Sequence, residues 1–500
     1  MNGLSGNQSP GVGMSLKGKS IATPALVAVI FSLGLCCTGC GDYFRPVANP
    51  VPLPGGDPQR TRHALVVSKN GLCPTGTTMD CGTAVAIDVS GDTAVAYFTG
   101  VNAVGRNPVH ATNLSGTDYV VNRDDNSLSS FLLPVVPNSL NPPSVITLPA
   151  GATPVFAAVA QNKVFVAESG RNSVAVVNPV TNSLAQEIPV GSNPVALVAT
   201  PDGTQLYCLN QGDSTVTVIL PANNTVFKTI TVGTSPVWGT ASSDSTRVFV
   251  VNQGDSTVSV IDTASDTVVG PPLPVGAGPN YIVYEPILNR AYVTSPAGHG
   301  LSIIDNNMGT VQTVSTAGAP CNALSPISVT ALADGTRAYV ADQTTNNVCV
   351  LNTASNTFTK VIPVGTAPTT TAAIASDSDS TRVYAASSAT LPIASISRSG
   401  NVVTVATSGS NAFAVGQTVV IAGVADTTYD GSFAIATVIS STQFTYPQSG
   451  ANSASSGGTA TVGYVAIIQT SDDTLVKQND GTTPLTIPTG GTPTFIAMTP

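Results

Sequence analysis

A near-verbatim internal repeat is the feature of this chain that most constrains its fold. The segment QLYCLNQGDSTVTVI begins at Gln205, and RVFVVNQGDSTVSVI begins 42 residues later, at Arg247. Self-similarity with a period of about 20 to 50 residues is the signature of solenoids, propellers and repeat arrays. The repeat therefore predicts that much of the 500-residue chain is one array rather than a string of unrelated domains.

Further copies of this segment occur along most of the chain. Each contains a short apolar run, and these runs end at Ser68, Asn122, Glu168, Asn210, Asn252, Ser295, Asp342 and Ser387. A second kind of apolar run opens with a proline, at Pro108, Pro154, Pro194, Pro236, Pro279, Pro326, Pro368 and Pro493. Both series have eight members, which predicts eight repeat units.

Each unit contains four segments with the character of β-strands. In the unit around Asn252 these are SPVWGTASSDS, TRVFVVN, TVSVIDT and a last segment through VVGPPLPVG, separated by turns rich in Gly, Asp and Ser. Only three of the chain's 27 acidic residues are Glu, which favours helices, whereas Asp favours turns. A lone four-stranded sheet cannot bury both faces, but sheets stacked around an axis cover one another. The pattern predicts an all-β fold, a β-propeller of four-stranded blades.

The segment RVFVVNQGDSTVSVIDTASDTVV, with LPVGAGP after it, resembles the YVTN-type β-propeller repeat family. In that repeat a strand ending near Tyr-Val-Thr-Asn precedes a Val-Ser-Val-Ile-Asp strand, and Val-Gly-x-x-Pro leads into the next blade. The resemblance covers residues 64–500 apart from one insertion, and it implies a ring closed by the C-terminal strand. We count eight blades from the repeats, with seven as the alternative that the family resemblance favours.

We place the whole propeller over residues 63–500. Its last unit is interrupted. Its second strand, RVYAASS, is separated from its third, GYVAIIQT, by a long segment with alternating strands of its own. We therefore predict a small β-domain inserted over residues 391–462. It resembles short β-modules of bacterial surface and phage-tail proteins.

The N-terminal segment predicts export. Lys17 and Lys19 precede IATPALVAVIFSLGL, an apolar run of signal-peptide length that is too short to span a bilayer as a helix. CCTGCGDYF then resembles the lipobox of bacterial lipoproteins, with Cys40 as the lipidated residue, and plain secretion is the alternative. We expect a signal peptide over residues 1–39 and a lipidated, Pro-rich tether over residues 40–62. The protein would be extracytoplasmic and lipid-anchored to a bacterial membrane, in the periplasm or on the cell surface.

Charge and cysteine content narrow the range of partners. Only 9% of residues are charged and the net charge is −9, which disfavours nucleic acid as a partner because its binding rests on clustered Lys and Arg, and we expect none. Cys73 and Cys81 flank a Gly- and Thr-rich loop, and in an exported chain we expect them to form a disulfide. Spacing leaves open whether Cys321 pairs with Cys349.

Catalytic and metal-binding motifs are not found in the sequence, and we assign no catalytic residue, metal or cofactor. His63, His110 and His299 lie in different units without metal-ligand spacing. The Asp clusters at 124–125 and 377–379 fall where hairpin turns are expected, which favours a turn over a calcium loop. The arginines that precede second strands are interpreted as a solvated rim: Arg247, Arg290, Arg337 and Arg382.

One variable position carries aromatic side chains. It lies two residues after each proline of the first strands and is occupied by His110, Phe156, Ala196, Trp238, Tyr281, Ser328, Thr370 and Phe495. Near the inner end of each blade these residues could line the channel mouth and stack on a ligand. Packing as wedges between blades is the alternative. The candidate binding residues are His110, Trp238, Tyr281 and Phe495.

The preferred functional hypothesis is a monomeric, membrane-anchored lipoprotein that serves as a binding or scaffold module for an envelope protein or glycan. The insertion and the Cys73–Cys81 loop occupy equivalent places in adjacent blades, and long loops on a rigid scaffold are where recognition tends to reside. A structural protein of the envelope is a further reading. The main alternative is a propeller enzyme or enzyme subunit, either a lactonase-like hydrolase or a dehydrogenase-associated protein, with its site at the channel mouth. That alternative rests on fold analogy.

Overall fold

The computed structural model describes residues 63–72, 81–98, 104–133, 143–345, 347–365, 369–410, 413–478 and 480–499. Within these ranges the regular structure is β-strand apart from one short 3-10 turn, η2 (Thr427–Tyr429). Cys40, Cys73 and the predicted signal peptide and tether lie outside the described residues. In the described part of the chain there is no helix of the length and apolarity that a membrane crossing needs.

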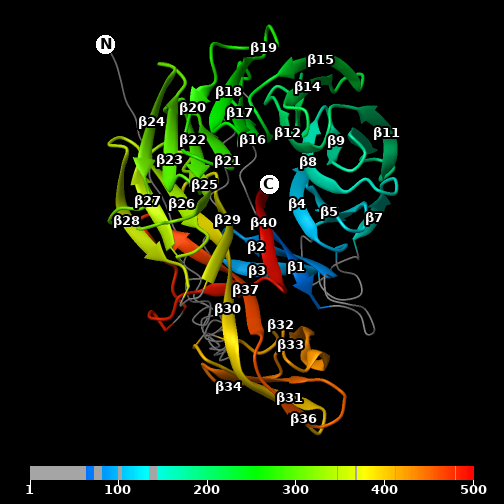
Figure 1. The fold of residues 1–500 in the computed structure, drawn as a ribbon, viewed down its shortest axis with the longest axis vertical. Helices are drawn as coiled ribbons and strands as arrows, with labels where there is room; N and C mark the ends of the chain where they lie inside the picture. The colour runs from blue at the N-terminus through cyan, green and yellow to red at the C-terminus, as the bar shows by residue number, and fades with distance from the viewer. Residues whose placement is uncertain are drawn as a thin grey trace, which may run out of the picture. The chain divides into compact units, whose positions relative to one another are not determined.

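The described strands form eight sheets, which are the blades of a β-propeller (Figure 1). Blades 1 to 4 contain, from the inner to the outer strand: β40 (Thr492–Thr499), β1 (His63–Gly71), β2 (Cys81–Asp88) and β3 (Thr93–Phe98); β4 (Pro108–Leu114), β5 (Thr117–Asn122), β6 (Ser127–Leu132) and β7 (Ser144–Thr147); β8 (Pro154–Ala160), β9 (Lys163–Glu168), β10 (Ser173–Asn178) and β11 (Ser183–Pro189); β12 (Pro194–Ala199), β13 (Leu206–Asn210), β14 (Thr215–Leu220) and β15 (Thr225–Thr231).

Blades 5 to 8 continue the ring in chain order. They contain: β16 (Pro236–Ala241), β17 (Arg247–Asn252), β18 (Thr257–Asp262), β19 (Thr267–Val268) and β20 (Leu273–Pro274); β21 (Tyr281–Glu285), β22 (Arg290–Ser295), β23 (Gly300–Asp305) and β24 (Thr310–Ser315); β25 (Pro326–Ala331), β26 (Arg337–Asp342), β27 (Asn347–Asn352) and β28 (Thr357–Pro363); β29 (Thr369–Ser376), β30 (Arg382–Ser399), β37 (Thr459–Gln469), β38 (Thr474–Leu475) and β39 (Thr486–Pro488).

The innermost strands form a closed ring. Each contacts the next in the order β40, β4, β8, β12, β16, β21, β25, β29 and back to β40. The C-terminal β40 pairs antiparallel with β1, Val66 lying opposite Ile496, and so completes the first blade. The predicted fold class is confirmed: the described strands form eight blades closed by the C-terminal strand. Six blades have four strands, and in blades 5 and 8 two short strands share the outermost position.

The polar residues that recur in each repeat hold the blade together. At the end of β17, the Asn252 side-chain amide donates to the hydroxyls of Thr257 and Ser259 on β18, both at 3.0 Å. Asp255, in the turn between those strands, accepts a hydrogen bond from the backbone N–H of Thr234 at 2.8 Å. In both blades that contain the NQGDS segment, the Asn bonds two hydroxyls of the third strand and the Asp bonds a backbone N–H of the entering loop, which explains why the segment recurs nearly unchanged.

The glycine of the Val-Gly-x-x-Pro segment allows the chain to pass close to that asparagine. A Cβ placed on Gly233 would lie 2.4 Å from the side-chain nitrogen of Asn252. Gly191 has the same relation to Asn210, at 2.6 Å. The glycine is required here by close approach to a neighbouring side chain.

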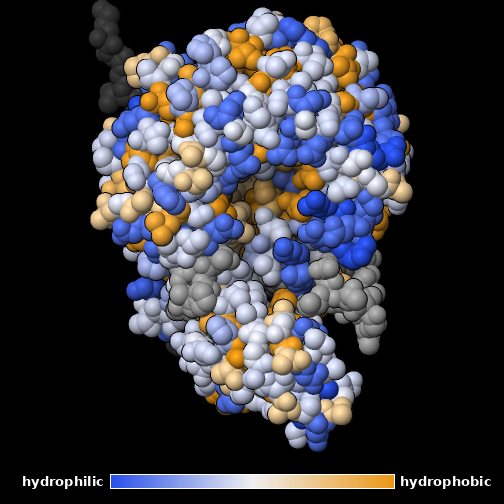
Figure 2. All heavy atoms as spheres, viewed as in Figure 1, coloured by the Kyte–Doolittle hydropathy of each residue, from blue (hydrophilic) through white to orange (hydrophobic). Residues whose placement is uncertain are grey.

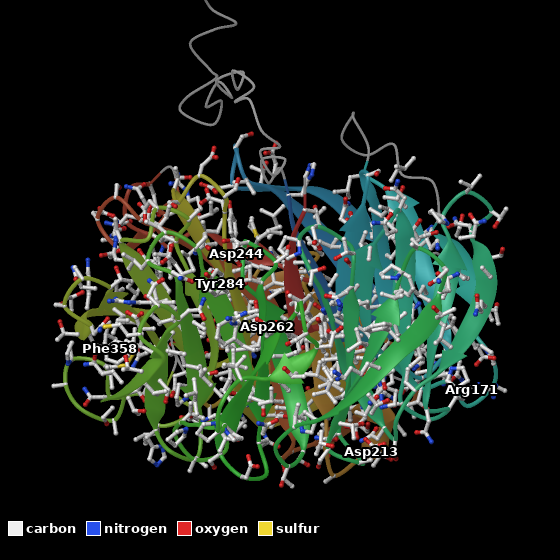
Figure 3. The ribbon with its side chains drawn as sticks, turned by 90° about the horizontal axis from the view of Figure 1, so that it is seen from above. Arg171, Asp213, Asp244, Asp262, Tyr284 and Phe358 are labelled. Carbon is white, nitrogen blue, oxygen red and sulfur yellow. A yellow bond between two sulfur atoms is a disulfide. The ribbon has the colours of Figure 1, made fainter. Side chains whose placement is uncertain are left out.

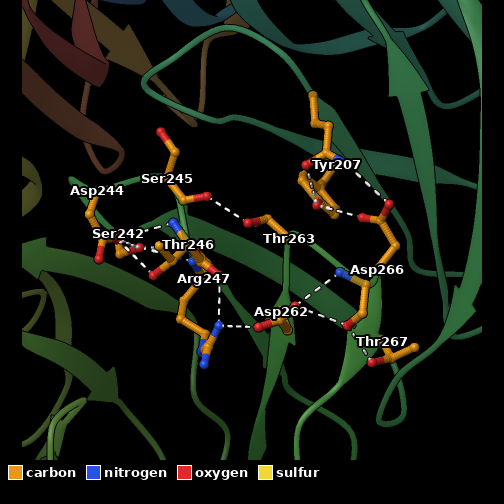
Figure 4. Close-up of polar contacts among 12 residues, drawn as sticks. Tyr207, Ser242, Asp244, Ser245, Thr246, Arg247, Asp262, Thr263, Asp266 and Thr267 are labelled. Carbon is orange, nitrogen blue, oxygen red and sulfur yellow. Dashed lines mark hydrogen bonds and ion pairs between the residues drawn. The ribbon is translucent and has the colours of Figure 1, made fainter.

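Neighbouring blades are joined at the outer turns. In Figure 4 the hydroxyl of Tyr207 on β13 donates to Asp266, which lies in the turn after β18 in the next blade, at 2.7 Å. Figure 4 also shows Arg247 paired with Asp262 of its own blade. The solvated-rim interpretation is wrong for Arg382, whose side chain is only 4% exposed and pairs with Asp92 at 3.0 Å. The rim arginine of the last blade is buried because the first blade packs over it.

The inserted segment continues directly from two strands of blade 8. β30 and β37 pair without interruption from Arg382↔Gln469 to Pro392↔Thr459, leaving the blade as one ladder. Beyond the blade they carry β31 (Val402–Thr407), β32 (Thr418–Ala422), β33 (Gly431–Ala434), β34 (Thr437–Ser440), β35 (Gln443–Pro447) and β36 (Ser453–Ser455). One apolar cluster runs from blade 7 through Ala389 and Leu391 to Phe444, so the insertion shares its core with the ring.

The structure answers the question that cysteine spacing leaves open. Cys321, before β25, is bonded to Cys349 on β27, with their Cα atoms 5.4 Å apart. Cys208 is fully buried and free, as expected for a small apolar residue in mid-strand. Cys81 begins β2, and its predicted partner is outside the described residues.

Candidate functional site

A cavity of about 260 Å³ lies at the centre of the ring. Figure 2 shows this hollow, with hydrophobic residues inside it. Its walls come from the start of every innermost strand: Val109, His110, Val155, Phe156, Val195, Val237, Trp238, Asn280, Tyr281, Ile327, Ser328, Ala372, Ala373, Ile374, Thr494, Phe495 and Ile496. The position two residues after each proline thus faces the channel in most blades.

A β-bulge in the first strand explains why two consecutive residues line the cavity. In blade 5, Pro236 pairs with Asn252 and Trp238 pairs with Val251, so Val237 has no opposite residue. The same shift occurs in blades 2, 3, 4 and 7. In a regular strand neighbouring side chains point to opposite faces, and a bulge breaks this alternation. The valine in the bulge and the aromatic residue after it, such as Val237 and Trp238, can then both reach the channel.

Five of the lining side chains form a continuous aromatic arc. Ring centroids are 4.3 Å apart for Phe495 and His110, 3.8 Å for His110 and Phe156, 5.1 Å for Phe156 and Trp238, and 4.9 Å for Trp238 and Tyr281. These are stacked, tilted and edge-to-face arrangements of the kind that aromatic pairs prefer. The other side of the cavity is lined by small and aliphatic residues of blades 7 and 8, among them Ser328, Ala372 and Ala373.

His110 is a neutral member of this arc. Burial lowers its pKa to about 3. Its Nδ1 accepts a hydrogen bond from the backbone N–H of Ala157 at 3.4 Å. The ring proton therefore lies on Nε2, and His110 presents an N–H donor rather than a base.

Most other polar groups of the wall are already satisfied by the fold. Asn280 donates to the carbonyl oxygen of Ile327 and accepts from Thr294, both at 2.8 Å. Thr494 donates to the backbone carbonyl oxygens of Val67 and Pro108. By contrast, neither Trp238 Nε1 nor the Tyr281 hydroxyl is engaged by any described residue. Of these free polar groups, the indole N–H only donates, whereas the Tyr281 hydroxyl can donate and accept.

All four candidate binding residues lie on the wall of this one cavity, although only the tertiary structure shows that they meet. Three of them, Trp238, Tyr281 and Phe495, also pack against apolar clusters, so lining the channel and filling space between blades are not exclusive. Thr370 is not the equivalent residue in blade 8. There the bulge falls between Thr371 and Ala373, so Ala372 and Ala373 take its place. These alanines and the bulged valines could not be predicted from the sequence, since no residue type marks a bulge.

Several buried carboxyls lie outside the cavity wall, and two of them have a pKa raised to about 7. Burial raises the pKa of Asp118 on β5 to about 7, although the hydrogen bond that Asn113 donates to this carboxyl at 2.7 Å opposes the shift. Burial likewise raises the pKa of Glu168 on β9 to about 7, and Ser173 donates to this carboxyl at 2.6 Å. Glu168 occupies the place that asparagine holds in other blades, and nearby Arg171, at the edge of the ring in Figure 3, pairs with Glu187.

The Asp clusters act as turn residues. Asp125 accepts from the backbone N–H of Arg106 at 2.6 Å, and Asp377 accepts from that of Thr381 at 2.8 Å. Among the described residues no group of three or more His, Cys, Asp or Glu is placed to hold a metal ion.

Fold and cavity together define a β-propeller with an uncharged, aromatic-lined central cavity. The family model described as the choice-of-anchor I domain matches residues 90–463, most of the chain, so the protein belongs to the choice-of-anchor I family. No curated protein sequence matches it.

Among the solved structures that this chain resembles, one has a TM-score above 0.5. Dihydro-heme d1 dehydrogenase NirN, in complex with DHE, is 12% identical, with a TM-score of 0.56 over 91% of this chain and 78% of that one. Hydrazine synthase of Kuenenia stuttgartiensis is 18% identical, with a TM-score of 0.46 over 56% and 92%. Virginiamycin B lyase from Staphylococcus aureus is 14% identical, with a TM-score of 0.45 over 56% and 90%. At these identities the likeness concerns the fold alone.

Proposed function

We propose that the protein is a lipid-anchored, extracytoplasmic binding or scaffold module, with a YVTN-like propeller that presents its inserted domain to an envelope protein or glycan. The observation that carries this proposal is the unbroken β30–β37 ladder. A strand pair that leaves the blade without a linker holds the inserted domain in a fixed orientation to the ring. Such an arm suits recognition at a distance from the membrane better than a flexible loop would.

The chemistry of the inserted domain favours an uncharged partner surface. Residues 391–462 contain three charged side chains, Arg398, Asp426 and Asp430. Arg398 lies buried against the ring of Tyr429, 4.6 Å from its centroid, and donates to Gln448. Asp430 accepts from the backbone N–H groups of Gly423 and Val424, and Asp426 caps η2. All three charges serve the fold, so a partner would meet hydroxyls, amides and apolar groups.

Exposed apolar side chains supply contact points on the inserted domain. Val415 is 68% exposed and Ile439 is 56% exposed, and every residue of the edge strand β34 is exposed. An exposed strand edge offers backbone groups for pairing as well. These features are what a protein or glycan partner of low charge could contact.

Photo-crosslinking in intact cells tests this function. A photoreactive residue at Val415 or Ile439 should give one recurrent adduct, and the adduct should persist at high salt because no charged pair is involved. Val180, on the propeller and 91% exposed, is the matched control position. Adducts from Val180 that match those from the inserted domain would contradict the proposal.

The membrane anchor has its own test. Cys40→Ala should release the protein from membranes into the soluble extracytoplasmic fraction, because the acyl chains would have no attachment point. Retention of this variant on membranes at wild-type levels would overturn the anchor. Deletion of residues 391–462 should abolish the crosslinked adduct while leaving the anchor in place. Because the insertion shares its apolar cluster with blade 7, chemical unfolding of this variant is measured alongside to establish that the ring keeps its fold.

A further inference from the structure

We propose that the central cavity binds an uncharged, flat, conjugated small molecule that carries carbonyl oxygens, stacked on the aromatic arc and hydrogen-bonded by Trp238, Tyr281 and His110. This site is separate from the inserted domain and does not depend on the proposed function. The inference follows from four properties of the cavity: its charge, its aromatic faces, its unpaired donors and its size.

The wall carries no ionisable group that would be charged at neutral pH. Its residues include no Asp, Glu, Lys or Arg, and His110 is neutral. A charged ligand would lose its hydration here without gaining a counter-charge, which is strongly unfavourable. The ligand is therefore uncharged.

The arc from Phe495 to Tyr281 lines the cavity with aromatic rings spaced 3.8 to 5.1 Å between neighbouring centroids. Rings in this arrangement offer faces and edges to another π system. On the opposite side, Ala372 and Ala373 leave room where a larger side chain would fill the channel. A flat conjugated ring fits between the two walls.

Hydrogen bonding distinguishes a carbonyl-bearing ring from a plain hydrocarbon. The indole N–H of Trp238 and the hydroxyl of Tyr281 have no partner among the described residues, and the proton of His110 lies on Nε2. The amide oxygen of Asn280 is already occupied by Thr294. Trp238 and His110 only donate here, whereas the Tyr281 hydroxyl can also accept, so free donors outnumber free acceptors. This balance favours a ligand that accepts, and a conjugated carbonyl oxygen accepts without donating.

The cavity volume limits the ligand to one ring or a fused pair. At about 260 Å³ it lies just below the roughly 300–1,000 Å³ typical of pockets for drug-sized molecules. A monosaccharide would fit the volume, but its hydroxyls need acceptors as well as donors. A quaternary ammonium ion would favour the ring faces but would face the positive ends of the free N–H and O–H groups.

Trp238 is the only tryptophan of the chain, so its fluorescence reports on this cavity directly. The full-length protein is titrated with menadione, a fused-ring quinone, and with naphthalene, which has the same two fused rings without carbonyl oxygens. Affinities are measured by calorimetry, and quenching of Trp238 locates the site. We expect saturable quenching by menadione and an affinity at least tenfold above that for naphthalene, since one or two hydrogen bonds separate the two ligands.

Variants separate the hydrogen bonds from the stacking. Tyr281→Phe keeps the ring and should lower menadione affinity three- to tenfold while naphthalene affinity stays within twofold. Tyr284→Phe is the matched control, because the hydroxyl of Tyr284 bonds Asn289 and does not line the cavity. Ala372→Leu should weaken both ligands by narrowing the channel. Equal affinities for menadione and naphthalene, an unchanged Tyr281→Phe variant, or tighter binding of glucose or tetramethylammonium would each overturn the proposal.

Discussion

Tyr384, on β30 of the last blade, donates a hydrogen bond from its hydroxyl to Asp92 of the first blade at 3.1 Å. Arg382 pairs with the other carboxylate oxygen of Asp92 at 3.0 Å, so one carboxylate binds two side chains across the closure of the ring. Tyr207 and Tyr339 bind Asp266 and Asp473 of their next blades in the same way. In all three the carboxylate belongs to a turn residue with positive φ.

This contact varies with the turn residue of the next blade. Phe165 and Phe249 occupy the tyrosine's place in blades 3 and 5. The corresponding turns of the next blades, 4 and 6, contain Asn224 and Gly309 in place of Asp. Tyr119 and Tyr292 hold the same position in blades 2 and 6, where the corresponding turns of the next blades contain Asn182 and Asn356, so a carboxylate in the next blade is not what selects tyrosine. The hydrogen bond from tyrosine to aspartate links three pairs of neighbouring blades among the described residues.

We expect Asp92→Asn to destabilise the protein by about 3–5 kcal/mol, because Arg382 would be left buried without a counter-charge. Asparagine tolerates positive φ, so the change isolates the charge. Urea unfolding at pH 7 measures the loss. Tyr384→Phe is the control and should cost only about 1 kcal/mol. If both variants lose the same amount, the ion pair contributes nothing beyond the hydrogen bond.

Asp118→Asn should stabilise the protein, and more so as the pH rises. Burial raises the pKa of the folded-state carboxyl from 3.8 to about 7. Below pH 4 both folded and unfolded states hold the proton, and no penalty arises. Between pH 4 and 7 only the unfolded state ionises, so wild-type stability falls and then levels off above pH 7.

The measurement is the difference in unfolding free energy between Asp118→Asn and wild type at pH 4.5, 6 and 8. Taking the difference removes the contribution of other groups that titrate in this range, including Glu168. A difference that stays constant with pH would show that Asp118 is ionised in the folded state at every pH measured.

Removing the disulfide between Cys321 and Cys349 should lower stability by about 3–4 kcal/mol, because the bond closes a loop of 28 residues in the unfolded chain. The double variant Cys321→Ala/Cys349→Ala is compared with wild type by thermal unfolding with and without reductant. Reductant should remove the difference between wild type and the double variant, because any effect on the predicted Cys73–Cys81 bond is common to both. A wild type insensitive to reductant and equal in stability to the variant would contradict the expected role.

Gly233→Ala should cost about 1–3 kcal/mol, since the new methyl group would lie 2.4 Å from the Asn252 amide nitrogen. Asn252→Ala alone should also destabilise, by leaving Thr257 and Ser259 without their donor. The double variant should lose less than the sum of the two, because removing the amide makes room for the methyl group. Strict additivity in chemical unfolding would show that the two residues do not interact.

Much of the fold could be predicted from the sequence because its determinants are local. The NQGDS segment specifies a hairpin through Asn252 and Asp255, and the recurrent prolines mark where inner strands begin. Equal counts of the two motifs gave the blade number, since each blade uses each motif once. The aromatic position was also visible, because its side chains break the small and aliphatic pattern around them.

The chain alone determined the class of fold, the number of blades and the closing strand, since turn chemistry and strand periodicity act over a few residues. Only the tertiary structure decided which side chains share the cavity, because the bulge at Val237 and the shift to Ala373 in blade 8 depend on strand pairing. It also decided that Arg382 is buried and that Cys321 bonds Cys349. Both facts arise from packing between segments distant in sequence, which no local pattern encodes.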